Sequence, residues 1–261
     1  MKATLMTITP EWAKRILDER NTANRPLNRH HVEHLAKEMR RGTWKLNGDT
    51  ICLNGNRLID GQHRLSAVVM SGVSIQSFVV EGLTDDVFDT KDIGKRRSHS
   101  ETLATKGEKN TSRLAAALML VDKYMTGRSD KQVCYTNMEI QELLEKYPGV
   151  RESAAANYRA RGLAYLSVID ACHYLFSQKD PELANEFVDK VMRGTGLEEG
   201  SPWYALRERL VSNSLLKSKM PRPDMMALCI KAWNATRAGT QIRVLRWNDR
   251  GQFAEAFPII R

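Results

Sequence analysis

The sequence has no long apolar run and no signal-like start. None of its apolar stretches approaches the roughly 20 residues that cross a bilayer. The opening MKATLMTITPEW lacks the apolar core of a signal peptide. We therefore expect a cytoplasmic protein with no membrane partner.

The cysteines are few and widely separated. The four of them, Cys52, Cys134, Cys172 and Cys229, form no C-x-x-C pair. This spacing argues against a zinc knuckle and against a disulfide scaffold. It predicts four buried thiols.

Internal repeats and low-complexity tracts are also absent, so the chain is an ordinary globular sequence. Its 261 residues, 42% hydrophobic and 27% charged, suffice for one large domain or two modest ones. The formal net charge is +9, and the last 45 residues hold nine Lys/Arg against three Asp/Glu. Such a surplus favours a polyanionic partner, with a solvated basic surface as the alternative.

Two helices are predicted before residue 43. TPEWAKRILDER has Thr9 as N-cap and Pro10 at the first helical position. NRHHVEHLAKEMRRG places its apolar residues on one face, with Asn28 as cap and Gly42 as stop. Two β-rich runs around Asn54-Gly55 then predict a hairpin, followed by a helix over about 61–70 and a strand, IQSFVVEG.

The second half is mostly helical. The predicted helical stretches are 111–126, 136–147, 150–178, 181–193, 202–213 and 222–238, with one late strand, IRVLRW, at 242–247. The predicted fold class is α+β: a small α/β domain over 1–108, followed by a mostly α-helical domain over 109–261 with a basic C-terminal region.

RLIDGQHRLSAV, residues 57–68, places polar side chains where a strand turns into a helix. The amide groups and dipole of a helix's first turn attract anions, and Gly61 would let a phosphate approach the backbone. Arg64 can grip that phosphate, His63 can donate to it or shuttle a proton, and Gln62 lies beside them. Asp60 can cap the helix, or hold a metal ion or a nucleotide hydroxyl. The alternative is a capping Asp60 followed by three solvated side chains.

This stretch resembles the signature of the ParB/sulfiredoxin-like superfamily, a DG-[QH]-[HQ]-R corner after a hairpin. Upstream, NRPLNRHHVEHLAKEMRRGTWKLNGD resembles the superfamily's Arg-Pro box, helix and link to the hairpin, so the resemblance covers roughly residues 20 to 105. The DGQHR form is most similar to phage and DNA-modification-associated proteins called ParB-like nucleases. Gln62 replaces the acidic residue of chromosome-partition ParB, which disfavours a CTP clamp, and no cysteine stands at the corner for sulfiredoxin chemistry.

The resemblance implies a nucleoside triphosphate, ATP or CTP, bound at the corner with Mg²⁺. Arg25 in the Arg-Pro box would then face the nucleotide, with an exposed turn as the alternative. DTKDIGKRRSHSETL, residues 89–103, is similar to a D-x-G-x-x-R stretch of the phage proteins. There Asp92 is a candidate magnesium ligand or general base and Arg96 a second phosphate clamp, with a charged loop as the alternative.

HHVEH, residues 30–34, matches the H-x-x-E-H pattern of a zinc hydrolase. His30 and His34 would share a helix face, as zinc requires. However, Val32 and Met39 occupy the inward face, which leaves the histidines on or beside the polar one. We favour a polar helix face near the nucleotide over zinc hydrolysis and leave any role of the two histidines open.

KAWNATRAGTQIRVLRW, near the C-terminus, interleaves aromatic and basic residues. Arg237, Arg243 and Arg246 are candidate nucleic-acid contacts. Tryptophans can stack on bases, but at helical spacing Trp233 is better explained as a core residue.

The sequence thus predicts an NTP-dependent protein, related to phage or DNA-modification systems, that acts on or alongside DNA. The reaction would be Mg²⁺-assisted hydrolysis or kinase-like phosphotransfer. Asp60, His63 and Asp92 would be catalytic, Asp60 and Asp92 would hold the metal, and Arg64 with Arg96 would neutralise phosphate charge. A non-catalytic, nucleotide-switched DNA-binding regulator and a ParB-like nuclease are the alternatives. Whether the chain is a monomer or a homodimer stays open, and a phage-encoded chain would act in the host cytoplasm.

If the basic C-terminal residues hold phosphates, DNA affinity should fall steeply with salt. For Arg243→Ala combined with Arg246→Ala, we expect the slope of log affinity against log salt on a non-specific duplex to flatten by roughly one unit per lost contact. Fluorescence anisotropy between low and moderate salt measures this slope. Affinity equal to the wild type at every salt concentration would remove these residues from DNA binding.

Overall fold

The computed structural model describes residues 1–22, 24, 26–84, 98–129, 131–156, 162–216, 219–249, 251–252 and 254–261. The chain divides into two compact units. Unit 1 comprises Met1–Arg96 with Cys134–Met138, and unit 2 comprises Arg97–Val133 with Glu139–Arg261. The sequence-based division at residue 108 stays a prediction.

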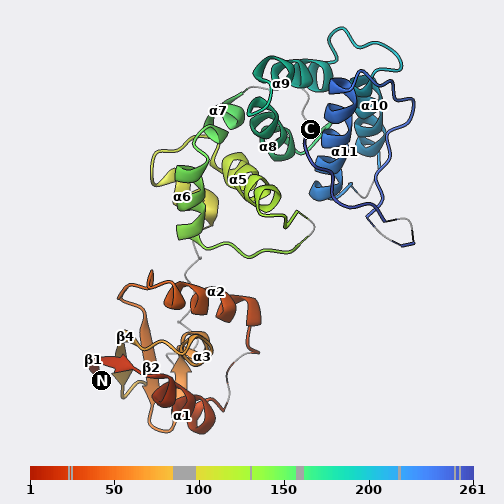
Figure 1. Ribbon diagram of the computed structural model, residues 1–261. Helices are drawn as coiled ribbons and strands as arrows, with labels where there is room; N and C mark the ends of the chain where they lie inside the picture. Colours follow the sequence, from red (N-terminus) through yellow and green to blue (C-terminus); the bar gives the residue numbers. More distant parts are fainter. Residues whose placement is uncertain are drawn as a thin grey trace. The chain divides into compact units, whose positions relative to one another are not determined.

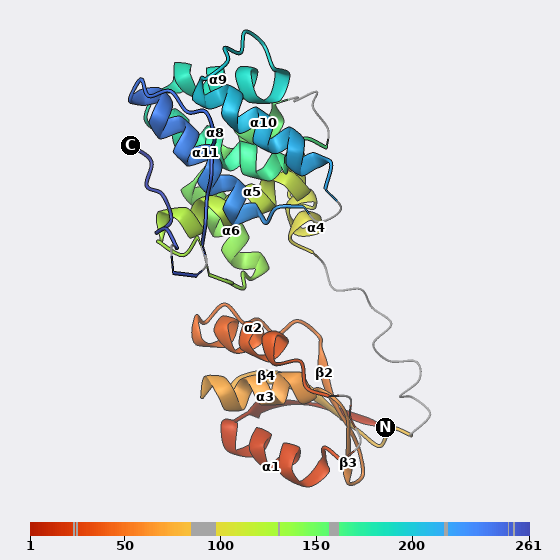
Figure 2. The same cartoon turned by 90° about the vertical axis from the view of Figure 1, so that its right-hand side faces the viewer.

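Unit 1 is a four-stranded mixed sheet with three helices (Figure 1). Its elements are β1 (Lys2–Ile8), α1 (Pro10–Arg20), α2 (Arg29–Arg40), β2 (Thr50–Asn54), β3 (Arg57–Asp60), α3 (Gln62–Ser71) and β4 (Ile75–Glu81). The strand order is β1-β4-β2-β3, in which β2 and β4 are parallel and the two outer pairs are antiparallel. The helices gather on one side of the sheet (Figure 2).

The predicted caps of the first two helices are confirmed. Thr9 Oγ1 accepts a hydrogen bond of 3.2 Å from the backbone N–H of Trp12 and begins α1. Asn28 Oδ1 accepts one of 3.1 Å from His31 N–H and begins α2. Gly42 follows α2 with a φ of +68°, a left-handed conformation that suits glycine. These local signals fix where both helices start and where α2 stops.

The predicted hairpin and the helix after it are also confirmed. Asn54 pairs with Arg57 across a two-residue loop, in which Gly55 has a φ of +46°. Helix α3 ends at Ser71, and Gly72 caps it with a left-handed backbone (φ +70°) and an N–H bonded to the carbonyl of Val68. The chain then returns as β4 beside β2.

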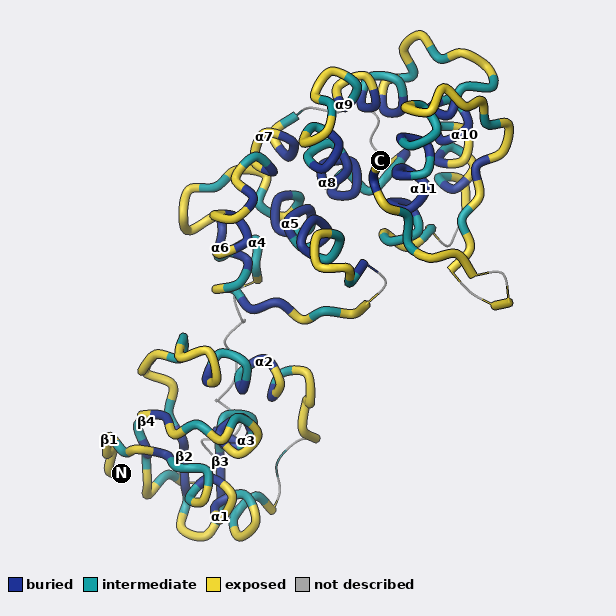
Figure 3. The backbone as a smooth tube through the Cα atoms, in the orientation of Figure 1, coloured by how far each residue is buried: buried dark blue, intermediate teal, exposed yellow. Residues whose placement is uncertain are grey.

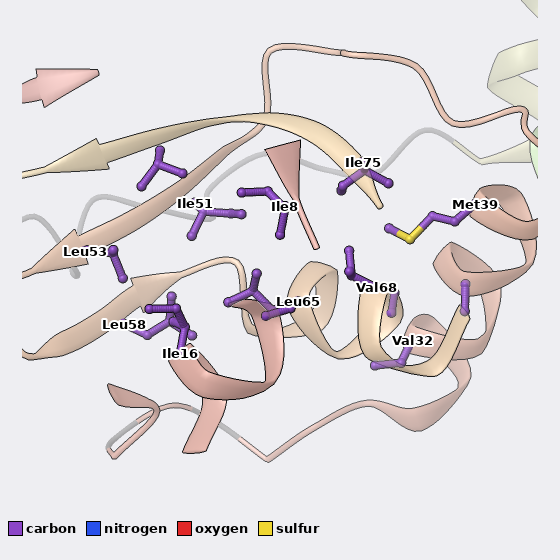
Figure 4. Packing of buried hydrophobic residues seen from close by; sticks show 14 residues of the cluster. Ile8, Ile16, Val32, Met39, Ile51, Leu53, Leu58, Leu65, Val68 and Ile75 are labelled. Atoms are coloured by element: carbon purple, nitrogen blue, oxygen red, sulfur yellow. The ribbon is translucent and has the colours of Figure 1, made fainter. Parts of the chain in front are cut away.

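The core of unit 1 lies between the sheet and the helices (Figure 4). Ile8, Ile51 and Leu58 contribute from three strands, and Leu65 and Val68 from α3; all five are fully buried. Each such side chain stabilises the fold by about 1.5–3 kcal/mol relative to an exposed one. This apolar layer fixes α3 against β2 and β3.

Two assignments made from the sequence differ from the structure. Lys2–Ile8 was not identified as a strand, yet it pairs with β4 along its whole length. Conversely, the strand predicted at 242–247 is wrong, because that stretch has no strand geometry and Ile242 N–H bonds the carbonyl of Gly200. Strand formation depends on a distant partner: β4 provides one for β1, whereas the described part of unit 2 contains no strand.

Unit 2 is helical. Its elements are α4 (His99–Ala104), α5 (Thr111–Met125), α6 (Asn137–Lys146, from Glu139 on), α7 (Val150–Ala155), α8 (Leu166–Ser177), α9 (Pro181–Val188) with a π-helical turn (Asp189–Arg193), α10 (Pro202–Ser214) and α11 (Arg222–Arg237). The α+β fold class is thereby confirmed. Within the described ranges, no helix has both the length and the apolar character that crossing a membrane requires.

The single helix predicted over 150–178 is wrong. Helix α7 ends at Ala155, and Ala156 is already extended. Gly162 has a φ of +88°, which no helix interior accommodates, and α8 begins only at Leu166. A glycine in a helix interior costs about 1 kcal/mol, and here it marks a genuine break.

The core of unit 2 is aromatic, and Figure 3 shows the buried segments of α5, α8 and α11. Trp233 of α11 is fully buried and stacks on Phe176 of α8, with ring centroids 4.2 Å apart. Phe187 of α9 meets the same Phe176 ring edge-on at 5.2 Å. The expectation that Trp233 is a core residue is confirmed.

Three of the four cysteines are buried as predicted. Cys52, Cys172 and Cys229 lie in the interior, whereas Cys134 is exposed and contradicts the expectation. All four are free thiols. Burial raises the pKa of Cys172, with a further contribution from a hydrogen bond to Cys229, so this thiol stays protonated and unreactive.

A buried ion pair joins α5 to α8. The Arg113 guanidinium holds Asp170 through two bonds, Nε to Oδ2 at 3.0 Å and Nη2 to Oδ1 at 2.6 Å. Asp170 is 0% exposed. Arg113 Nη1 also donates to the carbonyl of Ala156, just after α7. One guanidinium therefore ties three helices together.

Arg113→Leu should destabilise unit 2 strongly, because it removes the guanidinium that holds a fully buried carboxylate in two bonds. We expect a loss of about 3–5 kcal/mol in the free energy of unfolding, measured by urea denaturation. The matched control is Arg151→Leu, which breaks the more exposed bidentate pair of Arg151 with Glu108. That change should cost about 1 kcal/mol or less. Equal losses in the two variants would contradict a structural role particular to Asp170.

Candidate functional site

The predicted strand–turn–helix corner exists, with an unexpected cap. β3 ends at Asp60, and α3 begins at Gln62 with Gly61 as its N-cap. Asp60 Oδ1 accepts a 2.6 Å hydrogen bond from the N–H of Gly61, its immediate neighbour. Asp60 is therefore not the helix N-cap, and Gly61, which takes that place, has no side chain to cap α3. The amide groups at a helix start are an anion-binding feature.

Gly61 is required by its backbone and by its neighbour. Its φ is +107°, a region that L side chains rarely adopt. A Cβ at this position would lie 3.2 Å from Cγ1 and 3.4 Å from Cα of Ile51. The side of Gly61 where a Cβ would stand therefore faces β2. Close packing against Ile51 is enough to require glycine at this position, with no phosphate involved.

His63 connects α3 to the start of α2. Its Nε2 accepts a 3.0 Å hydrogen bond from the backbone N–H of Asn28, the α2 N-cap. Its ring lies 5.3 Å from that of His31. Because Nε2 accepts, the proton of a neutral His63 is on Nδ1. Protonation of Nε2, or a ligand that recruits it, would break the bond to Asn28.

Arg64 connects α3 to the start of β2. Its Nη1 donates to the carbonyl of Thr50 at 2.5 Å, and its Nη2 lies 3.9 Å from Oδ2 of Asp49. The side chain is only 14% exposed. The arginine is therefore part of the packed corner rather than a solvated residue. Arg64→Ala would cost folding free energy, because Thr50 O would lose a charged donor.

The structure brings five of the predicted site residues together. Asp60, Gly61, Gln62, His63 and Arg64 all lie within one turn, and Gln62 is 7% exposed. The other predicted residues of this site, Arg25, Asp92 and Arg96, lie outside the described residues.

The histidines of α2 do not form a zinc site in the structure. His30 is 78% exposed and 3.8 Å from Glu33, whereas His34 is 7% exposed. His34 thus lies in the interior rather than on the expected polar face. Among the described residues, no three His, Cys, Asp or Glu side chains gather as a metal ion would require.

The C-terminal candidates separate into two groups. Arg243 and Arg246 are exposed, as a nucleic-acid contact requires. Arg237 is exposed too, but its Nη1 donates to the carbonyl of Arg261 at 2.6 Å and holds the chain end on α11. Trp247 packs edge-on against Phe257, with ring centroids 5.8 Å apart. The tryptophans therefore serve packing, and the arginines remain the candidates.

Sequence reasoning missed the partners of the corner. Asn28 was identified only as a helix cap, and Thr50 not at all. Both bonds use backbone groups, Asn28 N–H and Thr50 C=O. Every residue type except proline has the same backbone N–H and C=O, so the sequence cannot indicate which of them a side chain will bond. These contacts are seen only in the structure.

Comparison with protein-family models, with curated proteins and with solved structures found no match for this chain. The resemblance to the ParB/sulfiredoxin-like superfamily therefore remains a prediction from the quoted residues.

Gly61→Ala should destabilise the fold more than Gly72→Ala, at the other end of the same helix. Both glycines have positive φ, but a Cβ at Gly72 meets nothing within 4 Å. We expect a loss of about 1 kcal/mol for Gly72→Ala from backbone strain alone, and about 2–3 kcal/mol for Gly61→Ala from strain plus displacement of Ile51. Chemical denaturation measures both values. Equal losses of unfolding free energy in the two variants would show that the packing of Gly61 against Ile51 is not tight.

Proposed function

We propose that unit 1 binds a nucleoside triphosphate at the Asp60–Arg64 corner and that the protein acts on or alongside DNA. The observation that carries the proposal is the start of α3, where a left-handed Gly61 is the N-cap and Gln62, His63 and Arg64 share the first turn. The first turn of α3 thus carries backbone amide groups, an imidazole and a guanidinium, a combination suited to phosphate oxygens. The resemblance of DGQHR to phage and DNA-modification proteins supports the same ligand.

Each residue has a role in this proposal. Arg64 neutralises phosphate charge, and His63 donates a hydrogen bond or moves a proton. Asp60 would hold Mg²⁺ together with Asp92 through a carboxylate oxygen of each. Magnesium sites often use one or two protein carboxylates and complete their shell with phosphate and water. The metal would neutralise charge on the phosphates during hydrolysis or phosphotransfer.

Charge supports the DNA part of the proposal. The net charge is +9, with about two thirds of it in the last 45 residues. Arg243 and Arg246 are exposed in that region. A basic surface of this kind neutralises backbone phosphates without reading sequence.

A second function, a nucleotide-operated switch without turnover, is favoured by the bonds of His63 and Arg64. These side chains hold Asn28 N–H and Thr50 C=O. A phosphate that recruits either side chain must break its bond and release the start of α2 or β2. Binding energy would then be coupled to the position of α2, which is what a switch requires.

Nucleotide binding should raise the melting temperature, since a ligand that binds only the folded state stabilises it. ATP, CTP, GTP and dNTPs are tested with Mg²⁺ by differential scanning fluorimetry. We expect one of them to produce a shift of a few degrees that His63→Gln reduces and His30→Gln leaves intact. His63 is a cleaner target than Arg64, whose loss also weakens the fold. The absence of a shift with every nucleotide, or an equal shift in both variants, would refute the site.

Release of inorganic phosphate separates the two functions. With the nucleotide that gives the shift, hydrolysis produces many phosphates per protein molecule, whereas a switch produces none beyond the stoichiometric amount. The measurement is repeated with DNA present, because DNA is the expected partner.

A further inference from the structure

Unit 2 contains a cavity of about 190 Å³ whose position suits an anion. The lining comes from the chain before α8, from the end of α10 and from the start of α11. Leu163, Tyr165 and Met225 provide an apolar wall, and Asn213 and Lys219 provide polar groups. No acidic side chain is among the described lining residues.

Asn213 is the decisive residue of this cavity. It is 5% exposed, and its Oδ1 accepts a 2.8 Å hydrogen bond from the N–H of Met220. Within the part of the chain that the structure describes, its amide NH₂ has no hydrogen-bond partner. The amide nitrogen is not among the fully enclosed side-chain atoms that lack a partner, so it keeps contact with solvent. Because Asn213 lines the cavity, a ligand with an acceptor oxygen would satisfy that donor.

The N-terminal ends of two helices and two basic side chains lie at or near this cavity. Tyr165 is the N-cap of the twelve-residue helix α8, and no side chain caps that helix. Met225 belongs to the first turn of α11, which also lacks a side-chain cap. Lys219 lines the cavity, and the guanidinium of Arg222, which is not a lining residue, lies 4.6 Å over the ring of the lining residue Tyr165.

We propose that this cavity binds a phosphomonoester with a small flat apolar ester group. Phosphate presents three acceptor oxygens, which suit the Asn213 NH₂ and the Lys219 ammonium of the lining, and the Arg222 guanidinium over Tyr165 adds positive charge nearby. The flat group would lie against Leu163, Tyr165 and Met225. Asp224 is in the first turn of α11 but does not line the cavity. The site lies wholly within unit 2, so its failure leaves the proposal for the Asp60–Arg64 corner unchanged.

Phenyl phosphate is the probe, with binding to the full chain measured by isothermal titration calorimetry. Asn213→Asp keeps the acceptor that Met220 needs and replaces the free donor by a negative charge. We expect it to weaken binding by roughly tenfold or more. Lys219→Gln, at an exposed position, tests the charge separately and should weaken binding even if Asn213→Asp folds poorly.

Lys190→Gln is the matched control. Lys190 donates to the backbone carbonyl of Gly196, as Lys219 does to that of Ser214, but it does not line the cavity. This variant should bind as tightly as the wild type. Inorganic phosphate and phenol probe the two halves of the ligand, and each should bind more weakly than phenyl phosphate. No binding of phenyl phosphate, equal binding by a folded Asn213→Asp or by Lys219→Gln, or equal binding of phenol would overturn the proposal.

Discussion

The contact between Gly61 and Ile51 determines the geometry of unit 1. A side chain at position 61 would meet Ile51 at 3.2 Å, so only glycine lets β3 turn into α3 this close to β2. The first turn of α3 consequently lies within reach of two other chain segments. His63 meets the start of α2, and Arg64 meets the start of β2. The residues that suggested a phosphate site from the sequence are thus also the residues that assemble the unit.

Because the candidate ligand-binding side chains also hold the unit together, a ligand at the corner would affect the fold. His63 and Arg64 each hold one backbone group, and a phosphate that attracts them competes with those bonds. The net cost of exchanging one such bond is about 1 kcal/mol, and more when a charge is involved. A bound triphosphate offers several charged contacts, so it can displace both bonds. Nucleotide affinity and the positions of α2 and β2 are then parts of one equilibrium.

The elements that the sequence predicted are those defined by local chemistry. Thr9 and Asn28 cap their helices through bonds to residues three positions away, and a two-residue loop with Gly55 closes the hairpin. Elements that depend on distant partners were missed. β1 forms because it pairs with β4 along its whole length. Only its last residue, Ile8, is fully buried, so its sequence lacks the alternation of apolar and polar residues that identifies a half-buried strand.

The same limit applies to the sites. Side chains of the Asp60–Arg64 corner were predictable because they are consecutive, whereas their partners are 14 and 35 positions away. Arg113 and Asp170 are 57 residues apart, and nothing in either local sequence indicates that they pair. Asn213 likewise appears as an ordinary residue near a helix end until its burial and its unused NH₂ are seen together.

The amide signal of Asn28 offers the most direct test of nucleotide binding at the corner. Its N–H donates to His63 Nε2, the bond that a phosphate at the corner would disturb. In ¹H–¹⁵N spectra of the labelled full-length chain, titration with the stabilising nucleotide and Mg²⁺ should shift this signal together with those of Gln62, His63 and Arg64. Saturable shifts confined to other parts of the chain, with Asn28 and the first turn of α3 unmoved, would contradict a nucleotide site at this corner.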